Sequence, residues 1–420
     1  MITRSLGRNL LTGVATMVAT LCVTTFSYAM SSAPSAEVAA AADPITEFQN
    51  SWAGQALATQ RAMTQSVPFS EETILGSHNT YNSEAYRNAT RYIDPQQIHS
   101  IYDQLRIGAR FIELDVHWTA HTHGWPWEWG TDLLLCHSGI GAELGDLHLG
   151  CSLTDRFAKD GVQEVANWLN ANPNEVIILY FEDHSDGHHQ ELYNIVNGKL
   201  GDKIYRSEGC RSIPSNLSRK DVLNAGKQVV LWKDGGCSNH SGMQQLAFTG
   251  LGQVNRIWED RTSIGAIGAF FTNGSVNRIE TQDVIQAFNN GGNIVNLDNL
   301  TYNDGRMVAG VWSWDQNEPN NWGGNQDCAL QWGNGRWDDA HCDSQHFFAC
   351  QNNETGEWEV STYADGWTDG QNACGLLGNF RFAAPQNAQQ NQALFNAKGG
   401  ITHVWVNASD AESEGQWIIH

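Results

Sequence analysis

Three short stretches decide the fold: Leu75-Gly-Ser-His-Asn-Thr-Tyr81, Arg110-Phe-Ile-Glu-Leu-Asp-Val-His-Trp118 and Leu133-Leu-Leu-Cys-His-Ser-Gly139. Each begins with the apolar residues of a buried strand and carries imidazole or carboxylate side chains at its far end. In a sheet of parallel strands these polar ends face a shared mouth, where a site can be assembled from several strands. We therefore expect the three stretches to build one functional site.

The residues at these strand ends suit proton transfer beside a metal ion. His78 and His137 can act as base and acid on opposite sides of a reacting phosphorus atom. Glu113 and Asp115, two residues apart on a strand, point to one face. Two carboxylates that face the same site repel each other, which is costly unless a cation or a proton lies between them. With Asn79, these oxygen ligands favour Ca²⁺ or Mg²⁺ over zinc.

A fourth stretch, Glu175-Val-Ile-Ile-Leu-Tyr-Phe-Glu-Asp-His184, is the strongest strand of the chain. Its continuous apolar run ending in charge is typical of a parallel strand buried on both faces. Its Glu182 adds a further ligand to the expected metal site. Apolar periodicity predicts further strands over 227–233, 255–260, 267–272, 293–300 and 307–314, with helices between several of them. The alternation predicts an α/β fold, a (β/α)₈ TIM-type barrel.

The composition divides the chain of 420 residues into segments. Residues 1–29 have the basic start, apolar run and small-residue end of a signal peptide, followed by an Ala/Ser-rich leader over 30–44. The barrel is expected over 45–313. From 314 to 420 Asp, Asn, Gln, Gly and Trp dominate, which predicts a second, disulfide-stapled domain. No later window holds the ~20 apolar residues of a transmembrane segment. We therefore expect a secreted, extracellular protein.

Net charge and cysteine usage narrow the function classes further. A formal net charge of −22 argues against nucleic acid, which demands clustered Lys and Arg. Eight cysteines remain after the signal peptide, and an even count in a secreted chain predicts four disulfides. Spacing favours Cys136–Cys151 and Cys210–Cys237, because each pair closes a local loop.

The motifs Gly76-Ser-His-Asn-Thr-Tyr81, Glu113-Leu-Asp115, Cys136-His137 and Leu179-Tyr-Phe-Glu-Asp-His184 resemble the phosphatidylinositol-specific phospholipase C X-domain family, in its calcium-dependent form. The resemblance implies that His78 stabilises the attacking hydroxyl and the pentavalent phosphorus, and that His137 protonates the leaving oxygen. It implies Ca²⁺ on Asn79, Glu113, Asp115 and Glu182, and a substrate-phosphate contact from Lys233. The family's inositol-binding elements are not evident, so the headgroup stays open.

The Trp-rich loop 118–129 follows the second strand and so is expected on the catalytic rim. One hypothesis makes it a wedge whose rings enter the head-group layer of a membrane. The alternative packs these rings on the barrel mouth or on each other. Several nearby histidines are predicted to be solvated loop residues: His117, His121, His123, His188 and His189.

In the second domain, the segment from Trp314 to Gln351 resembles the second half of a C-type lectin-like domain. The resemblance implies a calcium and sugar site made by five residues: Glu318, Asn320, Gln326, Asp338 and Asp339. Asp365–Trp417 resembles the first half of that fold. We therefore predict a circularly permuted domain with a hairpin from 345–351 and 358–364. The resemblance also implies the disulfides Cys328–Cys342 and Cys350–Cys374. The alternative is the tail of one module followed by a truncated second one.

Together these features predict a phosphoric diester hydrolase or lyase that uses Ca²⁺. Its expected substrate is a phosphatidylinositol-like phospholipid, or another phosphodiester, at a membrane surface. The lectin-like domain is expected to target a glycan. The alternative is a catalytically inactive barrel that serves as the scaffold of a secreted carbohydrate-binding adhesin.

Overall fold

The structure is a computed structural model that describes residues 42–92, 95–122, 128–137, 143–144, 147–148, 150–237, 240–250, 252, 255–259, 275–276 and 278–420. The predicted signal peptide and almost all of the leader lie outside these residues, as does the strand expected over 267–272. Residues 42–420 form one compact unit. No helix in the described part of the chain is long and apolar enough to cross a bilayer.

The first half of this unit is built on a parallel sheet with the strand order β11-β10-β12-β1-β2-β7-β9-β8. The strands are β1 (Ile74–Ser77), β2 (Phe111–Thr122), β7 (Ile177–His184), β8 (Ile204–Tyr205), β9 (Val229–Lys233), β10 (Arg256–Glu259), β11 (Ser275–Val276) and β12 (Ile294–Leu297). All neighbouring pairs along this path are parallel. The predicted α/β class is confirmed. Among the described residues no strand pairing joins β8 to β11.

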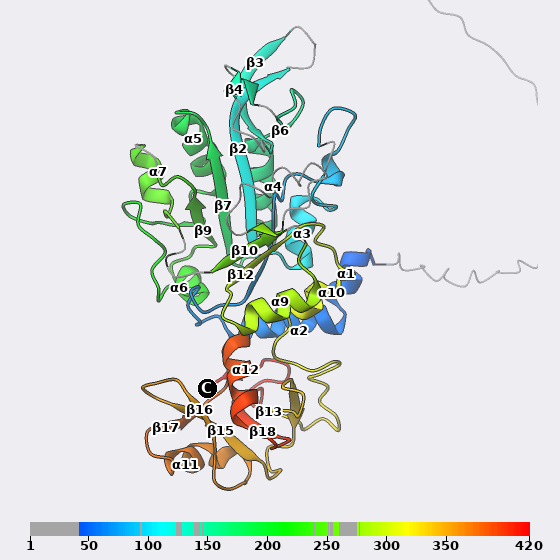
Figure 1. Cartoon of the computed structure of the whole chain (residues 1–420), viewed down its shortest axis with the longest axis vertical. Helices are drawn as coiled ribbons and strands as arrows, with labels where there is room; N and C mark the ends of the chain where they lie inside the picture. The colour runs from blue at the N-terminus through cyan, green and yellow to red at the C-terminus, as the bar shows by residue number, and fades with distance from the viewer. Residues whose placement is uncertain are drawn as a thin grey trace, which may run out of the picture. The chain divides into compact units, whose positions relative to one another are not determined.

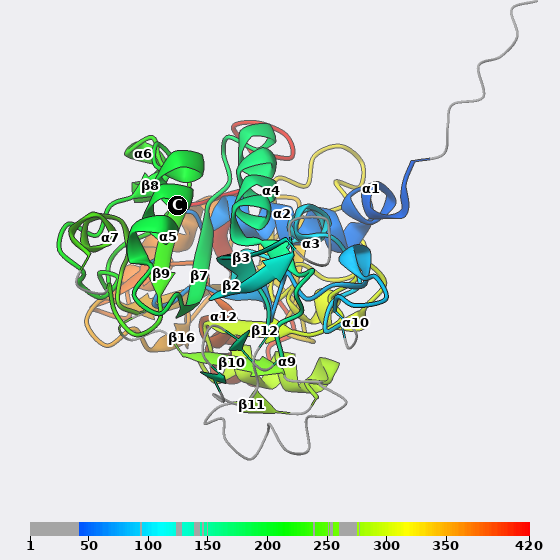
Figure 2. The ribbon, with the colours of Figure 1, turned by 90° about the horizontal axis from the view of Figure 1, so that it is seen from above.

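Helices connect these strands, as their apolar periodicity predicts. They are α1 (Pro44–Gln49), α2 (Trp52–Met63), the 3₁₀ turn Glu84–Tyr86, α3 (Ile101–Ile107), α4 (Ala158–Ala171), α5 (His189–Leu200), α6 (Arg219–Asn224), α7 (Ser241–Leu246), α9 (Thr281–Asn289) and α10 (Gly305–Ala309). Helix α4 buries Val162, Val165, Trp168 and Leu169 on one face. Figure 2 shows α4 and α5 beside strands β2 and β7.

The strand expected over 307–314 is wrong, because α10 occupies its start. The Asp304 side chain accepts the backbone N–H of Arg306 and so begins a helix. The Arg306 side chain then forms a buried ion pair with Glu259, at 2.5 Å. These polar contacts override the apolar run that suggested a closing strand.

The third stretch of the sequence is also placed differently from the prediction. Strand β3 (Trp129–Leu135) pairs with β2 antiparallel, from Thr122 opposite Trp129 to Val116 opposite Leu135. It is the returning arm of a hairpin, not a parallel barrel strand. In Figure 1 this hairpin extends beyond the neighbouring strands. Strand β6 (Arg156–Phe157) adds to β3, and β4 (Glu143–Leu144) pairs with β5 (Leu147–His148).

The second half of the unit contains a separate sheet with the order β14-β13-β18-β15-β16. Its elements are β13 (Cys328–Gln331), β14 (Trp337–Ala340), β15 (Phe347–Asn352), β16 (Trp358–Val360), the 3₁₀ turn Trp367–Asp369, α11 (Gly370–Gly375), β17 (Phe380–Phe382), α12 (Ala388–Ala397), β18 (Val404–Ser409) and β19 (Ile418–Ile419). Strand β17 pairs with β15, and β19 pairs with β18.

The two sequence segments of this second half fold as one domain. Strand β18, from the later segment, lies between β13 and β15 of the earlier one. The predicted hairpin is present, since β15 pairs with β16. All four expected disulfides form: Cys136–Cys151, Cys210–Cys237, Cys328–Cys342 and Cys350–Cys374. The last joins the segments covalently, which contradicts the alternative of two separate modules.

Candidate functional site

His78 lies at the carboxyl end of β1 and is held by an acidic partner from the end of β12. Its Nδ1 is 2.9 Å from Oδ1 of Asp298, and both side chains are buried. Burial alone would lower the pKa of His78, but the charges of Asp298 and Glu113 and the Asp298 hydrogen bond outweigh it and raise the pKa to about 9. His78 is therefore protonated at neutral pH in the protein alone.

The main chain of Asp298 is fixed on both sides. Its N–H donates to Oε2 of Glu259 at 3.1 Å, and its carbonyl oxygen accepts from Nη2 of Arg306 at 2.8 Å. The Glu259–Arg306 ion pair thus supports the orientation of His78 through Asp298. Asp298 was not among the site residues predicted from the sequence. The signal was an acidic residue after the last parallel strand.

Three carboxylates meet where β2 and β7 run side by side. Glu113, Asp115 and Glu182 each offer an oxygen, and these oxygens lie within 4.8 Å of one another. Asp115 stands directly opposite Glu182 in the strand register. Burial, followed by the charges of Glu182 and Glu113, raises the pKa of Asp115 well above its usual range. Tyr81 donates its hydroxyl hydrogen to Asp115 at 2.9 Å.

This donor set fits a divalent cation such as Ca²⁺. Carboxylate oxygens are its preferred ligands, and a cation would relieve the repulsion that raises the pKa of Asp115. Asn79 follows His78 with a left-handed backbone, φ 44°. Its Nδ2 donates to Oε1 of Gln96 at 2.6 Å, and its amide oxygen is an atom of the type that binds Ca²⁺. The four predicted ligands therefore have the chemistry that the cation needs.

The antiparallel return of β3 brings His137 to the same place. The N–H of Cys136 donates to the carbonyl oxygen of Asp115 at 3.3 Å, so His137 follows at the level of the carboxylates. Burial would raise the pKa of Glu182, but a hydrogen bond from His184 and the charges of His184, His137 and His78 lower it. Both predicted catalytic histidines therefore act electrostatically on one carboxylate.

Arg256, on β10, is a member of the site that sequence reasoning missed. Its Nη2 lies 2.5 Å from Oε2 of Glu113, which also accepts a hydrogen bond from Asn296. The guanidinium carbon lies 4.9–6.0 Å from the centres of four aromatic rings: Phe111, Tyr180, Trp232 and Trp258. Arg256 begins its strand, whereas the predicted site residues follow or end theirs, so only side-chain alternation along β10 could have indicated it.

Lys233 ends β9 and has partners of its own there. Its Nζ forms an ion pair with Asp183 at 2.5 Å and donates to the carbonyl oxygens of Asp234 and Gly236. Both charged side chains are almost fully buried. A substrate-phosphate contact from Lys233 would first have to break this pair. Lys233 therefore has the contacts of a structural residue.

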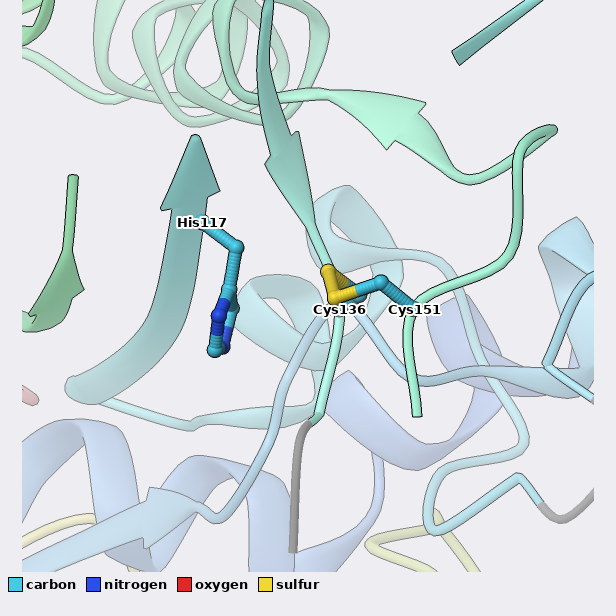
Figure 3. A group of neighbouring side chains, drawn as sticks. All are labelled: His117, Cys136 and Cys151. Atoms are coloured by element: carbon cyan, nitrogen blue, oxygen red, sulfur yellow. A yellow bond between two sulfur atoms is a disulfide. The ribbon is translucent and has the colours of Figure 1, made fainter. Parts of the chain in front are cut away.

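His117 and His121 correct another prediction, since both are buried on β2 rather than solvated in a loop. His117 stacks on His184 with ring centres 4.5 Å apart. Figure 3 shows His117 beside Cys136 and Cys151, a set with the spacing of a metal site. The two sulfur atoms are bonded to each other, so no thiolate is available for a metal ion.

Of the Trp-rich stretch 118–129, residues 123–127 lie outside the described residues, whereas Trp118 and Trp129 of its four tryptophans are described. Trp118 stacks on His188 with ring centres 3.6 Å apart, as the packing alternative expects. His188 is therefore covered on one face, unlike a fully solvated residue. Trp129 is 58% exposed. His123, Trp125 and Trp127 lie outside the described residues.

The second domain carries its own carboxylate cluster. Glu318, Asp338 and Asp339 bring oxygens within 4.8 Å of one another. Burial, a hydrogen bond with Asp339 and the charge of Asp338 raise the pKa of Glu318 to about 8. Asn320 donates its Nδ2 to Oε1 of Glu318 at 2.8 Å. Four of the five residues predicted for the lectin-like site therefore lie together: the three carboxylates form one cluster, and Asn320 contacts it through Glu318.

Gln326, the fifth, is used to hold the surrounding loop. Its Nε2 donates to the carbonyl oxygen of Asp339 at 2.9 Å, and its Oε1 accepts the N–H of Trp322. Trp322 itself is 79% exposed. Asn321, which sequence reasoning left out, donates its N–H to Oδ2 of Asp339 at 2.6 Å and its Nδ2 to Glu414. The loop is thus organised around Asp339.

Comparisons with known proteins agree with this two-part organisation. Residues 34–251 match the Rv2075c PI-PLC-like domain family, and residues 281–352 match the lectin C-type domain family. Two relatives from Mycobacterium tuberculosis, the uncharacterized proteins MT2135 (strain CDC 1551 / Oshkosh) and Rv2075c (strain ATCC 25618 / H37Rv), are each 28% identical over 407 residues, covering 86% of this chain and 80% of theirs. A hepatic lectin of Gallus gallus is 42% identical over 38 residues, which cover 9% of this chain and 18% of the lectin.

Two solved structures of bacterial proteins are among those that the chain matches. One is a phosphatidylinositol-specific phospholipase C from Listeria monocytogenes, with 17% identity, a TM-score of 0.33 and coverage of 60% of this chain and 98% of the other. The other is a calcium-dependent phosphoinositol-specific phospholipase C from Pseudomonas sp., with 15% identity, a TM-score of 0.36 and coverage of 59% and 93%.

Proposed function

Because the chain belongs to the Rv2075c PI-PLC-like domain family, we propose that it is a secreted, calcium-dependent phosphodiesterase that cleaves a phosphatidylinositol-like phospholipid. One observation carries the proposal. The Asp298-bound His78 and the returning His137 both act on Glu182, within a cluster of three carboxylates of which Glu113 and Asp115 are buried. Two proton-donating histidines beside carboxylates that can accept a proton or hold a cation form an arrangement that can cleave a phosphodiester.

Each residue of the site has its own role in the proposed reaction at the phosphorus atom. His78, protonated through Asp298, donates hydrogen bonds toward the phosphoryl oxygen and the attacking hydroxyl, and so stabilises negative charge that develops there. A carboxylate of the cluster takes the proton of the attacking hydroxyl, and His137 gives its proton to the leaving alcohol oxygen. Asn79, Glu113, Asp115 and Glu182 would hold Ca²⁺, which would neutralise charge on the phosphate.

Four disulfides support export, because such bonds persist in oxidising compartments. For the second domain we propose glycan binding through a cation at Glu318, Asp338 and Asp339, beside Asn320. A glycan held there would keep the enzyme close to a cell surface. Glycan-array binding that disappears in chelator, and in Asp338→Asn, is the expected result.

The catalytic proposal is tested with phosphatidylinositol vesicles in calcium and in chelator, followed by ³¹P NMR for a cyclic inositol phosphate. We expect product in calcium only, and a rate in His78→Ala and His137→Ala lower by about a hundredfold or more. His121→Ala is the matched control, a buried histidine of the same hairpin. No turnover of any phosphodiester, together with glycan binding, would instead support the inactive scaffold of an adhesin.

A further inference from the structure

Arg256 brings a permanent positive charge to the carboxylate cluster. Among the described residues its ion pair is with Glu113 alone, at 2.5 Å. Glu113 is also one of the three carboxylates whose oxygens lie within 4.8 Å of one another. One carboxylate therefore separates the guanidinium from the place that a divalent cation would take.

The arginine is held in this position by the barrel interior. Aromatic faces attract a cation, and rings on four different strand positions surround the Arg256 guanidinium. The arginine side chain is 11% exposed, so water screens its charge poorly. Its Nε has no hydrogen-bond partner among the described residues, so the rings and Glu113 account for its placement.

We propose that Arg256 is a positioning residue and built-in counter-ion that weakens the barrel's cation site, so that it fills only at extracellular calcium concentrations. The inference rests on the calcium site of the proposed function. Two physical effects favour it. The arginine occupies Oε2 of Glu113, which restricts Glu113 to binding through its other oxygen. Its charge also repels a divalent cation nearby in a poorly hydrated interior.

Weak binding suits the compartment that the disulfides indicate. Extracellular calcium modules work with dissociation constants of about 10⁻⁴ to 10⁻³ M, whereas tighter sites need more uncompensated ligand charge. The three carboxylates and the Arg256 guanidinium together carry a net charge of −2, whereas the carboxylates alone would carry −3. The site is then empty where calcium is scarce and filled outside the cell.

The test is calorimetric titration of the full chain with CaCl₂, without substrate. The second domain carries its own carboxylates, so each titration is repeated with Asp115→Asn added. The binding that is lost on this change is the binding to the barrel's cation site, here called Asp115-dependent binding. In Arg256→Met the Asp115-dependent binding should tighten about tenfold or more, because the opposing charge is gone. Arg256→Lys keeps the charge and should stay within about threefold of the unmodified protein. Arg278→Met, at an exposed arginine, matches the change in net charge.

A second neutral variant, Arg256→Gln, covers the case in which Arg256→Met does not fold, as checked by circular dichroism. Asp115-dependent binding that appears only in the neutral variants also supports the proposal. Unchanged or weaker binding in them, or no Asp115-dependent heat in any variant, overturns it. Unchanged binding with a raised KM would assign Arg256 to the substrate instead. Because the titration contains no substrate, a failure of phosphodiester turnover does not affect its outcome.

Discussion

Replacing Asp298 by asparagine should lower the pKa of His78 and remove a pH-dependent part of the protein's stability. In the protein this pKa rises from 6.5 to about 9, although burial opposes the rise. An elevation of about 2.5 units corresponds to roughly 3 kcal/mol of stabilisation of the folded state. The His78 side chain is only 7% exposed, so little of this is lost to solvent screening.

The sign of the pH dependence follows from proton binding. Because the folded protein holds the His78 proton more tightly, the stabilisation is fully present below pH 6.5 and is lost as the pH rises through about 9. Asparagine keeps the shape of Asp298 and its main-chain contacts with Glu259 and Arg306, but removes the charge. We expect the pKa of His78 to fall by about 1–3 units in the variant.

Two measurements check this prediction. NMR titration of the His78 ring gives its pKa directly, and urea unfolding between pH 6 and 10 gives the free energy of unfolding. Other groups titrate in this range, so the informative quantity is the difference between the two proteins. That difference should shrink as the pH rises from 6.5 to 9. An equal His78 pKa in both proteins, or a difference that does not change with pH, would refute the reasoning.

Three further predictions follow from the contacts described. Asp115→Asn should abolish turnover. It should also raise the free energy of unfolding in chelator by about 1 kcal/mol, because it removes a carboxylate that its neighbours repel; a higher melting temperature in chelator is the expected result. Lys233→Met should cost roughly 3 kcal/mol by removing the lysine partner of the buried Asp183 carboxylate, and the double variant with Asp183→Asn should recover most of it in urea unfolding. Replacing Cys350 and Cys374 by serine should cost about 3 kcal/mol, because the bridge spans 24 residues; a melting temperature equal to that of the parent would contradict this.

Much of the site was predictable because its residues follow strongly apolar strands. His78, Glu113, Asp115 and Glu182 stand at positions where local alternation determines the direction of the side chain. The order of β1, β2 and β7 then places them together without further information. The paired cysteines were likewise predictable, since close spacing or one lectin-like pattern limited their partners. The functional roles and the domain boundaries at 45, 313 and 314 stay predictions.

The remainder depended on contacts between residues far apart in the chain. The sequence of residues 133–139 is equally compatible with a parallel strand and with the returning arm of a hairpin, and only pairing with β2 decided between them. Asp298 lies 220 residues from His78, and Arg256 lies 143 residues from Glu113. No local pattern links such pairs. The sequence thus determined which residues could carry the chemistry, because short-range alternation sets the direction of side chains. Tertiary structure alone decided which charges face them, because long-range packing sets the distances on which electrostatic energy depends.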